Sequence, residues 1–449
     1  MSFPRYPAYK DSGVEWLGEV PAQWDVLGIK RVCAVVGGST PKSDQEAYWD
    51  GDIVWVTPAD LSRLIGFEIS DSLRTITSEG LASCGTTLVP QGSVVLSTRA
   101  PIGSLGIAAK ELCTNQGCKA LVPNDIGTRF LAYVLTASNE ALNFRGKGTT
   151  FLELSGDELA AFKIPLPLSS EQAAIATFLD RETAKIDALV AEQERLIALL
   201  KEKRQAVISH AVTKGLDPSV PMKDSGVKWL GEVPGHWEVC ALRHVIAAIE
   251  QGWSPECYAR EAEDQEWGVL KAGCLNGGNF RPSENKALPP ELPPEEAYEV
   301  RVGDVLMSRA SGSPELVGST AVVKATRERL MLSDKIFRLK LQGFVNAAFF
   351  VAALNSRPLR IQIENALSGG NGMANNLPQP SLLTFAMAVP PLTEQAPIAV
   401  FLEQETAKLD TLMTEARTAI TLLQERRTAL ISAAVTGQID VRGAPEQAP

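Results

Sequence analysis

The sequence predicts an α+β protein in which two strand-rich globular halves are separated by two long helices that pair antiparallel as a coiled coil. Three observations support this fold. The chain repeats blocks of its own sequence, two long stretches carry a heptad pattern, and short apolar runs bounded by turn residues lie between them. The repeat further predicts an internal pseudo-two-fold duplication.

Composition places the chain among ordinary globular proteins, with 45% hydrophobic and 21% charged residues. A net charge of −10 argues against a protein that coats nucleic acid or an anionic membrane by charge alone. The seven cysteines are scattered and fit a reducing compartment rather than a disulfide framework. No apolar run approaches the ~20 residues of a membrane span, and no signal peptide is visible. We therefore expect a cytoplasmic protein without a membrane partner.

Three blocks of sequence occur twice. Lys10–Trp24 returns as Lys223–Trp237, and Glu171–Leu189 returns as Glu394–Leu412. The block that starts at Arg204 returns from Arg427. The segments between these blocks differ in length and sequence. The period far exceeds the ~20–50 residues of a solenoid unit, so the repeated unit is a globular half with its helix.

This repeat sets the predicted boundaries. We expect a first globular half, a helix, a second globular half, a second helix and a short tail, over residues 1–168, 169–215, 216–392, 393–440 and 441–449.

Within the globular halves, short apolar runs bounded by Gly, Pro and Asp predict buried strands at Asp52–Thr57, Gly92–Ser97 and Gly303–Ser308. Helical patches are predicted at Thr128–Leu142 and Asn346–Ile363.

The two long helices are predicted from heptads. No Pro or Gly occurs from Ser170 to Thr213, and apolar residues recur every seven positions. The first seam contains Leu179, Ile186, Gln193, Leu200 and Val207, with Leu189 and Leu196 in the second position; the copy contains Leu402, Leu409, Ala416, Leu423 and Leu430, with Leu412 alongside. About 42 residues give a rod about 63 Å long. We assign partner contacts to Leu179, Ile186, Leu189, Leu402, Leu409 and Leu412.

Matching polar residues accompany these seams: Glu182 and Glu405, Lys203 and Arg426. They are either solvated helix surface or pairs across antiparallel helices, where buried polar residues fix register.

Motifs of catalysis are absent from the sequence. There is no Walker A loop, no Rossmann glycine pattern, no Asn/Asp-Pro-Pro-Tyr/Phe methyltransferase motif, no nucleophile elbow and no zinc-ligand spacing among the three histidines. We therefore predict a non-catalytic chain with no cofactor or metal of its own.

An arginine follows a buried strand in each half, in Ser97-Thr-Arg99 and Met307-Ser-Arg309. Such an arginine can form bidentate hydrogen bonds to a phosphate or to the O6/N7 edge of guanine. Alternatively, it anchors its loop through a carboxylate.

Polar loops provide further candidates. Glycine-rich stretches precede each helix, at 145–150 and 368–376, and are either phosphate-contacting loops or plain flexible turns. Thr114-Asn-Gln-Gly117 offers amides that can read adenine, and Ser333-Asp-Lys335 takes the equivalent place. The candidate DNA-contacting residues are Thr40, Lys42, Thr57, Thr98, Arg99, Asn115, Gln116, Lys147, Thr149, Thr150, Lys271, Ser308, Arg309, Lys335, Asn371, Asn375 and Asn376.

The repeated tryptophans, Trp16 and Trp24 with Trp229 and Trp237, allow a base-stacking interpretation. Because they lie in the shared part of both copies, we instead expect them to dock each globular half to the helices.

These motifs resemble the specificity subunit of type I restriction–modification systems. The resemblance rests on K-D-S-G-V-x-W-L-G-E-V-P-x-x-W and E-Q-x-x-I-A-x-F-L, each present twice, and on Gly38-Ser-Thr-Pro41, Trp55-Val-Thr-Pro-Ala-Asp60, Ser97-Thr-Arg-Ala-Pro-Ile-Gly103 and Thr114-Asn-Gln-Gly117. The second half departs from it, with Val269-Leu-Lys-Ala-Gly273 in place of the tryptophan motif.

The resemblance implies two target-recognition domains, each reading half of a split double-stranded DNA target, and a helical spacer that fixes the gap between the half-sites. It also implies as partners two copies of a methyltransferase subunit and restriction–translocase subunits, which would hold S-adenosylmethionine, ATP and Mg. The alternative is a coiled-coil scaffold without DNA recognition. The cyclic order of the repeats places Lys10–Trp24 where the second helix ends, so the two termini should lie close together.

Overall fold

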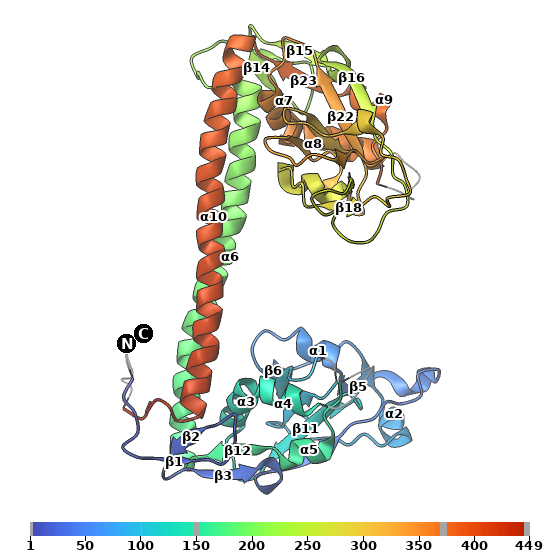
Figure 1. Cartoon of the computed structure of the whole chain (residues 1–449). Coiled ribbons are helices and arrows are strands. Elements are labelled where there is room, and N and C mark those ends of the chain that lie inside the picture. The colour runs from blue at the N-terminus through green and yellow to red at the C-terminus, as the bar shows by residue number, and fades with distance from the viewer. Residues whose placement is uncertain (1–2, 100, 147–151, 369–374, 444–449) are drawn as a thin grey trace. The chain divides into compact units, whose positions relative to one another are not determined.

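The computed structural model describes residues 3–99, 101–146, 152–368 and 375–443. The chain divides into two compact units, unit 1 with residues 1–193 and 418–449 and unit 2 with residues 194–417. The long helices α6 (Ser169–Lys214) and α10 (Leu392–Val435) each contribute a segment to both units. Each unit therefore contains one globular half and a pair of helix segments (Figure 1).

The globular half of unit 1 is built on small sheets. Its five-stranded sheet has the order β4 (Cys33–Gly37), β11 (Cys118–Pro123), β8 (Val94–Ser97), β9 (Leu105–Ala108) and β6 (Glu68–Ile69). A three-stranded sheet has the order β10 (Cys113–Thr114), β5 (Trp49–Val56) and β7 (Thr75–Ile76). Two pairs complete the strands, β1 (Tyr9–Asp11) with β2 (Glu19–Pro21) and β3 (Asp25–Gly28) with β12 (Lys163–Leu166).

Short helices cover these sheets, namely α1 (Pro58–Ser62), α2 (Ser78–Ser83), α3 (Thr128–Ala137), α4 (Asn139–Arg145) and α5 (Gly156–Ala161). The predicted helical patch at Thr128–Leu142 is therefore two helices. The break falls at Ser138, a buried residue whose hydroxyl donates to the Leu135 carbonyl and so competes with the helix backbone.

The globular half of unit 2 repeats this plan with fewer strands. Its four-stranded sheet has the order β16 (Ile246–Gln251), β22 (Ile336–Leu341), β19 (Val305–Ser308) and β20 (Thr320–Val322). The three-stranded sheet has the order β18 (Asn285–Ala287), β17 (Gly268–Leu270) and β21 (Leu330–Met331). The two pairs are β13 (Met222–Asp224) with β14 (Glu232–Pro234) and β15 (Glu238–Ala241) with β23 (Ala386–Val389).

Helices α7 (Ala347–Leu354), α8 (Arg357–Ser368) and α9 (Gln379–Thr384) accompany the sheets of unit 2. The predicted patch at Asn346–Ile363 is again divided in two. Ser356 lies at the break, fully buried, with its hydroxyl donating to the Ala353 carbonyl.

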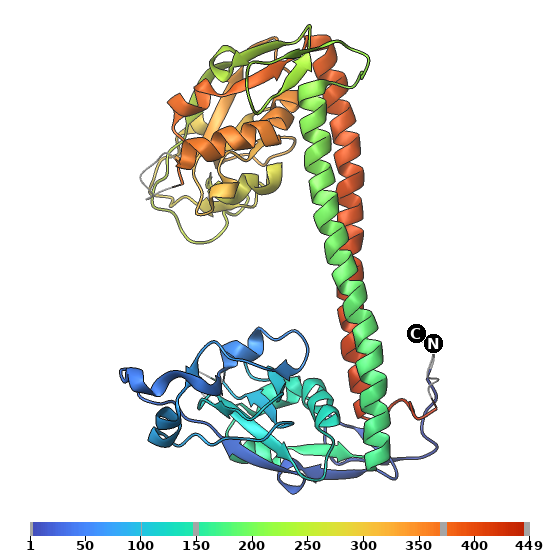
Figure 2. The ribbon, with the colours of Figure 1, turned by 180° about the vertical axis from the view of Figure 1, so that it is seen from behind.

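The segments of α6 and α10 run antiparallel in both units and lie side by side (Figure 2). In unit 1 the Arg427 guanidinium contacts the Asp187 carboxylate at 2.9 Å. In unit 2 Arg204 contacts Asp410 at 3.0 Å, one turn from the cluster of Leu200 with Met413. As residue numbers rise along α6, those of the neighbouring residues on α10 fall.

Six of the ten residues at the first heptad position are buried as predicted, namely Leu179, Ile186, Leu200, Leu402, Leu409 and Ala416. The other four, Gln193, Val207, Leu423 and Leu430, are only partly buried. The predicted second position is wrong, and the side chains of Leu189, Leu196 and Leu412 are 46%, 42% and 46% exposed. Met413, next to Leu412, is buried instead. Residues three or four positions apart lie on the same face of a helix, so Met413 can share the buried face of Leu409 in place of Leu412.

Of the two alternatives for the matching polar residues, helix surface is the one the structure supports, and Lys203 and Arg426 are exposed. Glu182 is bound within its own helix by Arg181 and Lys185, and Glu405 by Lys408. The contacts between the helices are those of Asp187 with Arg427 and Arg204 with Asp410. The two contacts use matching positions of the repeated helix sequence.

Two of the four repeated tryptophans, Trp24 and Trp237, connect the globular halves to the helix ends, as predicted, whereas Trp229 is 39% exposed and Trp16 stacks on Phe162. Trp24 is fully buried in the core that contains Ile431 and Val435 of α10. Trp237 is buried in the core that contains Ile208 and Val212 of α6. Neither indole is available for base stacking.

The two termini of unit 1 lie together, which confirms the prediction from the cyclic order of the repeats. The Asp440 amide donates to the Pro4 carbonyl at 2.8 Å, and the Tyr9 hydroxyl donates to the Gly437 carbonyl at 3.0 Å. Gly437 has a φ of +75°, and a Cβ there would lie 2.3 Å from Pro21, so only glycine fits at this helix end.

Candidate nucleic-acid interface

The end of strand β8 fixes the first candidate residues in unit 1. Every residue of β8 is buried, and Thr98 directly follows it. The Thr98 amide donates to the Gly117 carbonyl at 2.8 Å, while the Leu154 amide donates to the Thr98 carbonyl at 2.8 Å. Three distant segments are thereby held around this strand end.

Strand β19 of unit 2 ends in the same arrangement, with a shift of one residue. The Arg309 amide donates to the Lys335 carbonyl at 2.9 Å, and the Leu377 amide donates to the Arg309 carbonyl at 2.7 Å. Arg309 therefore occupies the backbone position of Thr98 and not that of Arg99. The predicted equivalence of Arg99 and Arg309 is wrong, because the second copy places its arginine one residue closer to the strand.

Arg99 nevertheless contacts the segment that follows the first glycine-rich stretch, and Arg309 contacts the last residue of the second. The Arg99 Nε lies 3.2 Å from a Glu153 carboxylate oxygen, with both side chains 44% exposed. The Arg309 Nε donates to the Asn376 Oδ1 at 3.1 Å, and its guanidinium lies 5.4 Å from the Phe337 ring centre. A carboxylate thus anchors Arg99, whereas an uncharged amide anchors Arg309 and does not neutralise it.

The Thr114–Gly117 turn of unit 1 packs against the Gly38–Pro41 segment. The Ser39 amide donates to the Thr114 carbonyl at 3.0 Å, and the Thr40 hydroxyl donates to the Gln116 Oε1 at 2.5 Å. A Cβ at Gly38 would lie 2.1 Å from the Thr114 carbonyl oxygen, which explains the glycine. The structure therefore brings together two predicted residues that are far apart in the sequence.

The remaining candidates of this turn are partly committed to local structure. The Asn115 Oδ1 accepts a hydrogen bond from the Gly117 amide at 2.9 Å. The Thr57 hydroxyl caps helix α1 through Asp60 at 2.5 Å. Lys42 is exposed, and Thr98 is fully buried with its hydroxyl directed at the Gly117 carbonyl.

Unit 2 builds the equivalent turn from different side chains. The Trp253 amide donates to the Leu332 carbonyl at 3.2 Å, as Ser39 does to Thr114. Ser254 then takes the place of Thr40, and its hydroxyl donates to the Asp334 carboxylate. Lys335 lies 3.0 Å from the same carboxylate. Although partial burial opposes it, hydrogen bonds from Ser254 and Lys335 hold the pKa of Asp334 below its ordinary value, so this carboxylate is ionised.

Sequence reasoning missed Ser254, and from the Ser333–Lys335 run it selected Lys335 and not Asp334. The signal was present, because Gly252-Trp-Ser-Pro255 has the same spacing as Gly38-Ser-Thr-Pro41. The two segments occupy equivalent places beside the two turns.

The other candidates of unit 2 lie in varied surroundings. Ser308 is fully buried, and its hydroxyl donates to the Ala310 carbonyl at 3.3 Å. Lys271 lies 3.8 Å from the Glu284 carboxylate. The Asn375 amide donates to the Gly312 carbonyl at 3.1 Å. Four predicted residues lie outside the described part of the chain, namely Lys147, Thr149, Thr150 and Asn371.

The predicted partner residues on the helices fall into two groups. Leu179, Ile186, Leu402 and Leu409 are buried within their own units. Leu189 and Leu412 occupy matching positions of the repeat and are each 46% exposed. Of the six, these two are therefore the most exposed and present nearly half of their surface to the outside.

The fold therefore presents two similar polar turns, Thr114–Gly117 and Leu332–Lys335, one in each strand-rich unit. The model of the type I restriction modification DNA specificity domain matches residues 21–197, which confirms the resemblance read from the sequence. Residues 21–197, less than half of the chain, are thus similar to a specificity domain of this family.

Several relatives support the same assignment. A type I restriction enzyme specificity subunit of Methanocaldococcus jannaschii is 40% identical over 36% of the chain and 38% of its own length. One of Escherichia coli is 31% identical over 46% of the chain and 35% of its own length, so these two matches span little more than a third of each relative. One of Salmonella potsdam is 23% identical over 94% of the chain and 90% of its own length. All three are named as specificity subunits, in agreement with the predicted non-catalytic role.

Solved structures share the fold. A chain of a type I restriction–modification system superposes with a TM-score of 0.69 at 16% identity, covering 95% of this chain and 99% of its own. The specificity subunit of Thermoanaerobacter tengcongensis gives a TM-score of 0.50, covering 94% and 98%. In the described residues, no helix is long and apolar enough to cross a membrane.

Proposed function

We propose that the chain is the sequence-specific DNA-recognition subunit of a type I restriction–modification complex and reads a bipartite target. The observation that carries this proposal is the pair of matched turns. In both units the same backbone hydrogen bonds hold a turn beside a strand end, whereas the side chains on this frame differ. Unit 1 presents Thr40 with Gln116, and unit 2 presents Ser254 with Asp334.

The difference between these side chains predicts two unlike half-sites. An amide such as that of Gln116 both donates and accepts, which suits the adenine edge in the major groove. An ionised carboxylate such as that of Asp334 only accepts, which suits the amino group of cytosine, while its neighbour Lys335 can donate to guanine. Two units with these groups would not select the same bases.

The repeated frame also supports an internal pseudo-two-fold arrangement. The contacts of Asp187 with Arg427 and of Arg204 with Asp410 use matching positions of the repeat, as a two-fold axis between antiparallel helices requires. Such symmetry suits a duplex whose strands are antiparallel, with half-sites centred about 34 Å apart. The exposed Leu189 and Leu412 provide two matching contacts for two copies of a methyltransferase subunit.

In this proposal the chain is non-catalytic, and S-adenosylmethionine, ATP and Mg belong to the methyltransferase and restriction subunits. Because the chain carries a net charge of −10, we expect it to bind DNA weakly until these partners add their own contacts.

Exchange of the turn residues tests the proposal. The chain assembled with its methyltransferase subunit is titrated with duplexes in which each half-site is varied. We expect Gln116→Ala to lose tenfold or more in discrimination at one half-site, since a bidentate base contact is worth about 1–3 kcal/mol. Asp334→Ala should act on the other half-site alone.

Lys110→Ala, on an exposed residue between β9 and β10, provides the surface control. If the wild-type complex shows no sequence preference, the chain is a scaffold and the recognition proposal fails. If both turn variants alter the same half-site, the bipartite assignment fails.

A further inference from the structure

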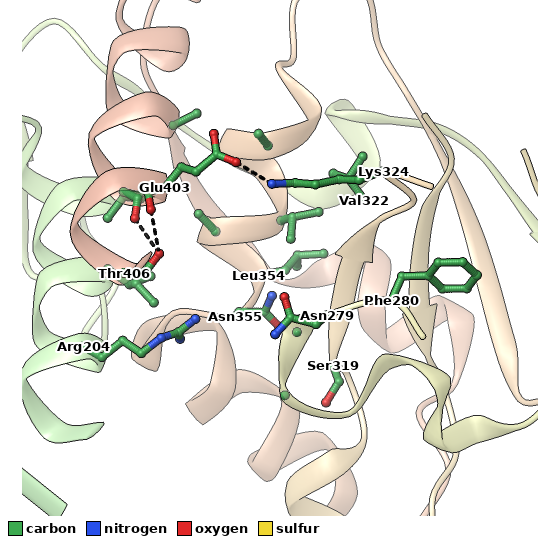
Figure 3. A pocket seen from close by; sticks show the side chains of 18 of the residues that line it. Arg204, Asn279, Phe280, Ser319, Val322, Lys324, Leu354, Asn355, Glu403 and Thr406 are labelled. Carbon is green, nitrogen blue, oxygen red and sulfur yellow. Dashed lines mark hydrogen bonds and ion pairs between the residues drawn. The ribbon is translucent and has the colours of Figure 1, made fainter. Parts of the chain in front are cut away.

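A cavity of about 1000 Å³ lies in unit 2 between its globular half and the helices. Ala348 and Ala352 of α7 line one side, and Glu403 and Thr406 of α10 line another. Figure 3 shows Glu403 joined to Lys324 across the cavity, with Thr406 below it on the same helix. The Lys324 ammonium lies 2.5 Å from the Glu403 carboxylate.

Unit 1 fills the corresponding space with its own side chains. The Tyr133 hydroxyl donates to the Asp180 carboxylate at 2.7 Å and lies 3.3 Å from the Thr183 hydroxyl. The Tyr133 ring is 2% exposed and packs edge-on against Phe67 at 5.1 Å. Arg129 contacts Asp180 at 3.4 Å from the same side.

The correspondence of the two sites rests on shared anchors. The amide that begins α3, at Gly127, donates to Gln172 of α6 at 2.7 Å. The amide before α7, at Asn346, donates to Gln395 of α10, also at 2.7 Å. Gln172 and Gln395 are matching residues of the repeated block.

Counting from these anchors identifies what unit 2 lacks. Tyr133 lies as many residues after Gly127 as Ala352 lies after Asn346. Unit 2 therefore has an alanine where unit 1 has the tyrosine. By the same count Ala348 replaces Arg129. The cavity is therefore the place that a tyrosine and an arginine vacate.

The acceptors for that tyrosine remain in unit 2. Glu403 and Thr406 match Asp180 and Thr183 in the repeat. Thr406 donates to the Leu402 carbonyl at 2.6 Å, as Thr183 does to Leu179 at 2.7 Å. Its oxygen lone pairs remain able to accept. A carboxylate and a hydroxyl thus line the cavity at the repeat positions that hold a phenol in unit 1, and the Glu403 carboxylate also binds Lys324.

We propose that this cavity binds a tyrosine side chain of a partner protein, with the phenol hydroxyl directed at Glu403 and Thr406. The volume favours a protein segment, since it lies at the upper end of the 300–1,000 Å³ typical of sites for whole drug-sized ligands and one ring would leave most of it empty. Val400, 54% exposed at the lining, adds an apolar surface of the kind that a protein covers. The inference rests on the proposed function in one respect, because the methyltransferase subunit is taken as the partner.

The first experiment tests the phenol site on the full chain alone. Ligand-observed NMR titration with p-cresol, the analogue of a tyrosine side chain, is compared with toluene, which lacks the hydroxyl. We expect p-cresol to bind at least tenfold more tightly than toluene. Ala352→Tyr, which restores the side chain of unit 1, should weaken p-cresol binding at least tenfold. Absence of p-cresol binding to the wild type overturns the proposal.

A second variant keeps this test decisive if Ala352→Tyr misfolds, which thermal unfolding will reveal. Thr406→Val preserves the shape of the side chain and removes its oxygen. It should reduce the preference for p-cresol over toluene severalfold. An unchanged preference contradicts the assigned role of the hydroxyl.

The second experiment tests the partner. We expect Ala352→Tyr to weaken assembly with the methyltransferase subunit at least tenfold, while Tyr133→Phe, the matched control in unit 1, leaves assembly unchanged. Wild-type affinity of the folded Ala352→Tyr chain overturns the proposal. Failure of the proposed function is distinguishable, because the wild-type complex would then bind duplexes without sequence preference whatever the result with p-cresol.

Discussion

Thr98 and Arg309 occupy the same backbone position at the ends of equivalent strands, yet their side chains differ in charge and exposure. Thr98 is buried, whereas Arg309 reaches the surface over the Phe337 ring. Arg99, one residue later, is paired with Glu153, while the Arg309 guanidinium donates to the Asn376 side-chain oxygen. Single substitutions on a shared backbone thus give the two units different charges at the proposed DNA face.

The pairing of Arg99 leads to a prediction about DNA affinity. Glu153→Gln places an amide in unit 1 where unit 2 has Asn376, and so removes the charge that neutralises Arg99. We expect tighter, sequence-independent binding of duplex DNA, because a freed cation adds up to one phosphate contact. The slope of log affinity against log salt should steepen by about 0.9.

Titration of the assembled complex across salt concentrations measures this slope. Asp157→Asn, which removes a carboxylate from the first turn of α5, is the charge-matched control. An equal steepening in both variants would show that net charge alone is responsible, and an unchanged slope in Glu153→Gln would show that Arg99 does not face DNA.

The sequence predicted residue types at this face better than their register. The motifs correctly indicated that an arginine follows each strand, since a short buried strand ending in a glycine-bearing loop is a local pattern. They did not reveal that Arg309 aligns with Thr98, because that shift is defined by hydrogen bonds to Lys335 and Leu377, which are distant in the chain. The sequence also predicted that the hydroxyl of Ser308 contacts DNA, whereas this residue is fully buried.

At the scale of elements, each globular half is attached to the helices by a tryptophan. Trp24 is buried with the end of α10, and Trp237 with the end of α6. The surroundings of the two indole nitrogens differ. The Trp237 Nε1 donates to Glu394 at 3.0 Å, whereas the buried Trp24 Nε1 has no partner among the described residues. The attachment at Trp24 therefore depends on packing of the ring, whereas that at Trp237 combines packing with a hydrogen bond.

Removal of either ring should destabilise its own unit. We expect Trp24→Ala and Trp237→Ala each to lower the free energy of unfolding by about 3–5 kcal/mol, since each leaves a large cavity in a core. Trp229→Ala, on a tryptophan that is 39% exposed in the same repeated block, should cost far less.

Hydrogen exchange resolved by segment measures these effects. Trp24→Ala should raise exchange in unit 1 and leave unit 2 protected, and Trp237→Ala should do the reverse. Equal loss of protection in both units from either variant would show that the units unfold as one, contrary to this prediction.

In the helices, the heptad spacing predicted the elements correctly but only part of their buried face. Heptads predicted both helices, and burial of Leu179 and Leu402 follows from the first seam position. The second position failed because a spacing of four places Met413, rather than Leu412, on the buried side. The ion pairs were missed for a related reason. Glu182 lies close to Lys185 within its own helix, and pairing within a helix at this spacing competes with pairing across helices.

At the scale of the whole molecule, the proposed function assigns one half-site to each globular half and the gap between the half-sites to the helices. Each helix contributes a segment to both units, so a change of helix length in one place alters the proposed spacer without touching either turn. The turn at Gln116 and the turn at Asp334 both lie outside the helix pair. Spacing and base choice should therefore vary independently.

Removal of one heptad from both helices tests this independence. We consider deletion of Val190–Leu196 together with Thr418–Gln424, segments that begin and end three residues from the Asp187–Arg427 ion pair and leave Leu189 and Leu412 in place. Seven residues are nearly two full turns, so the remaining seam keeps its face. The helices shorten by about 10 Å, which equals about three base pairs at 3.4 Å per step. Mapping of methylated adenines in cells that express the variant with its methyltransferase partner should reveal the original half-sites with a shorter gap. Because the turns are untouched, altered half-sites with an unaltered gap would contradict the assignment of the gap to the helices. The control is the deletion in α6 alone, which breaks the register between the two helices. It should abolish methylation at every target.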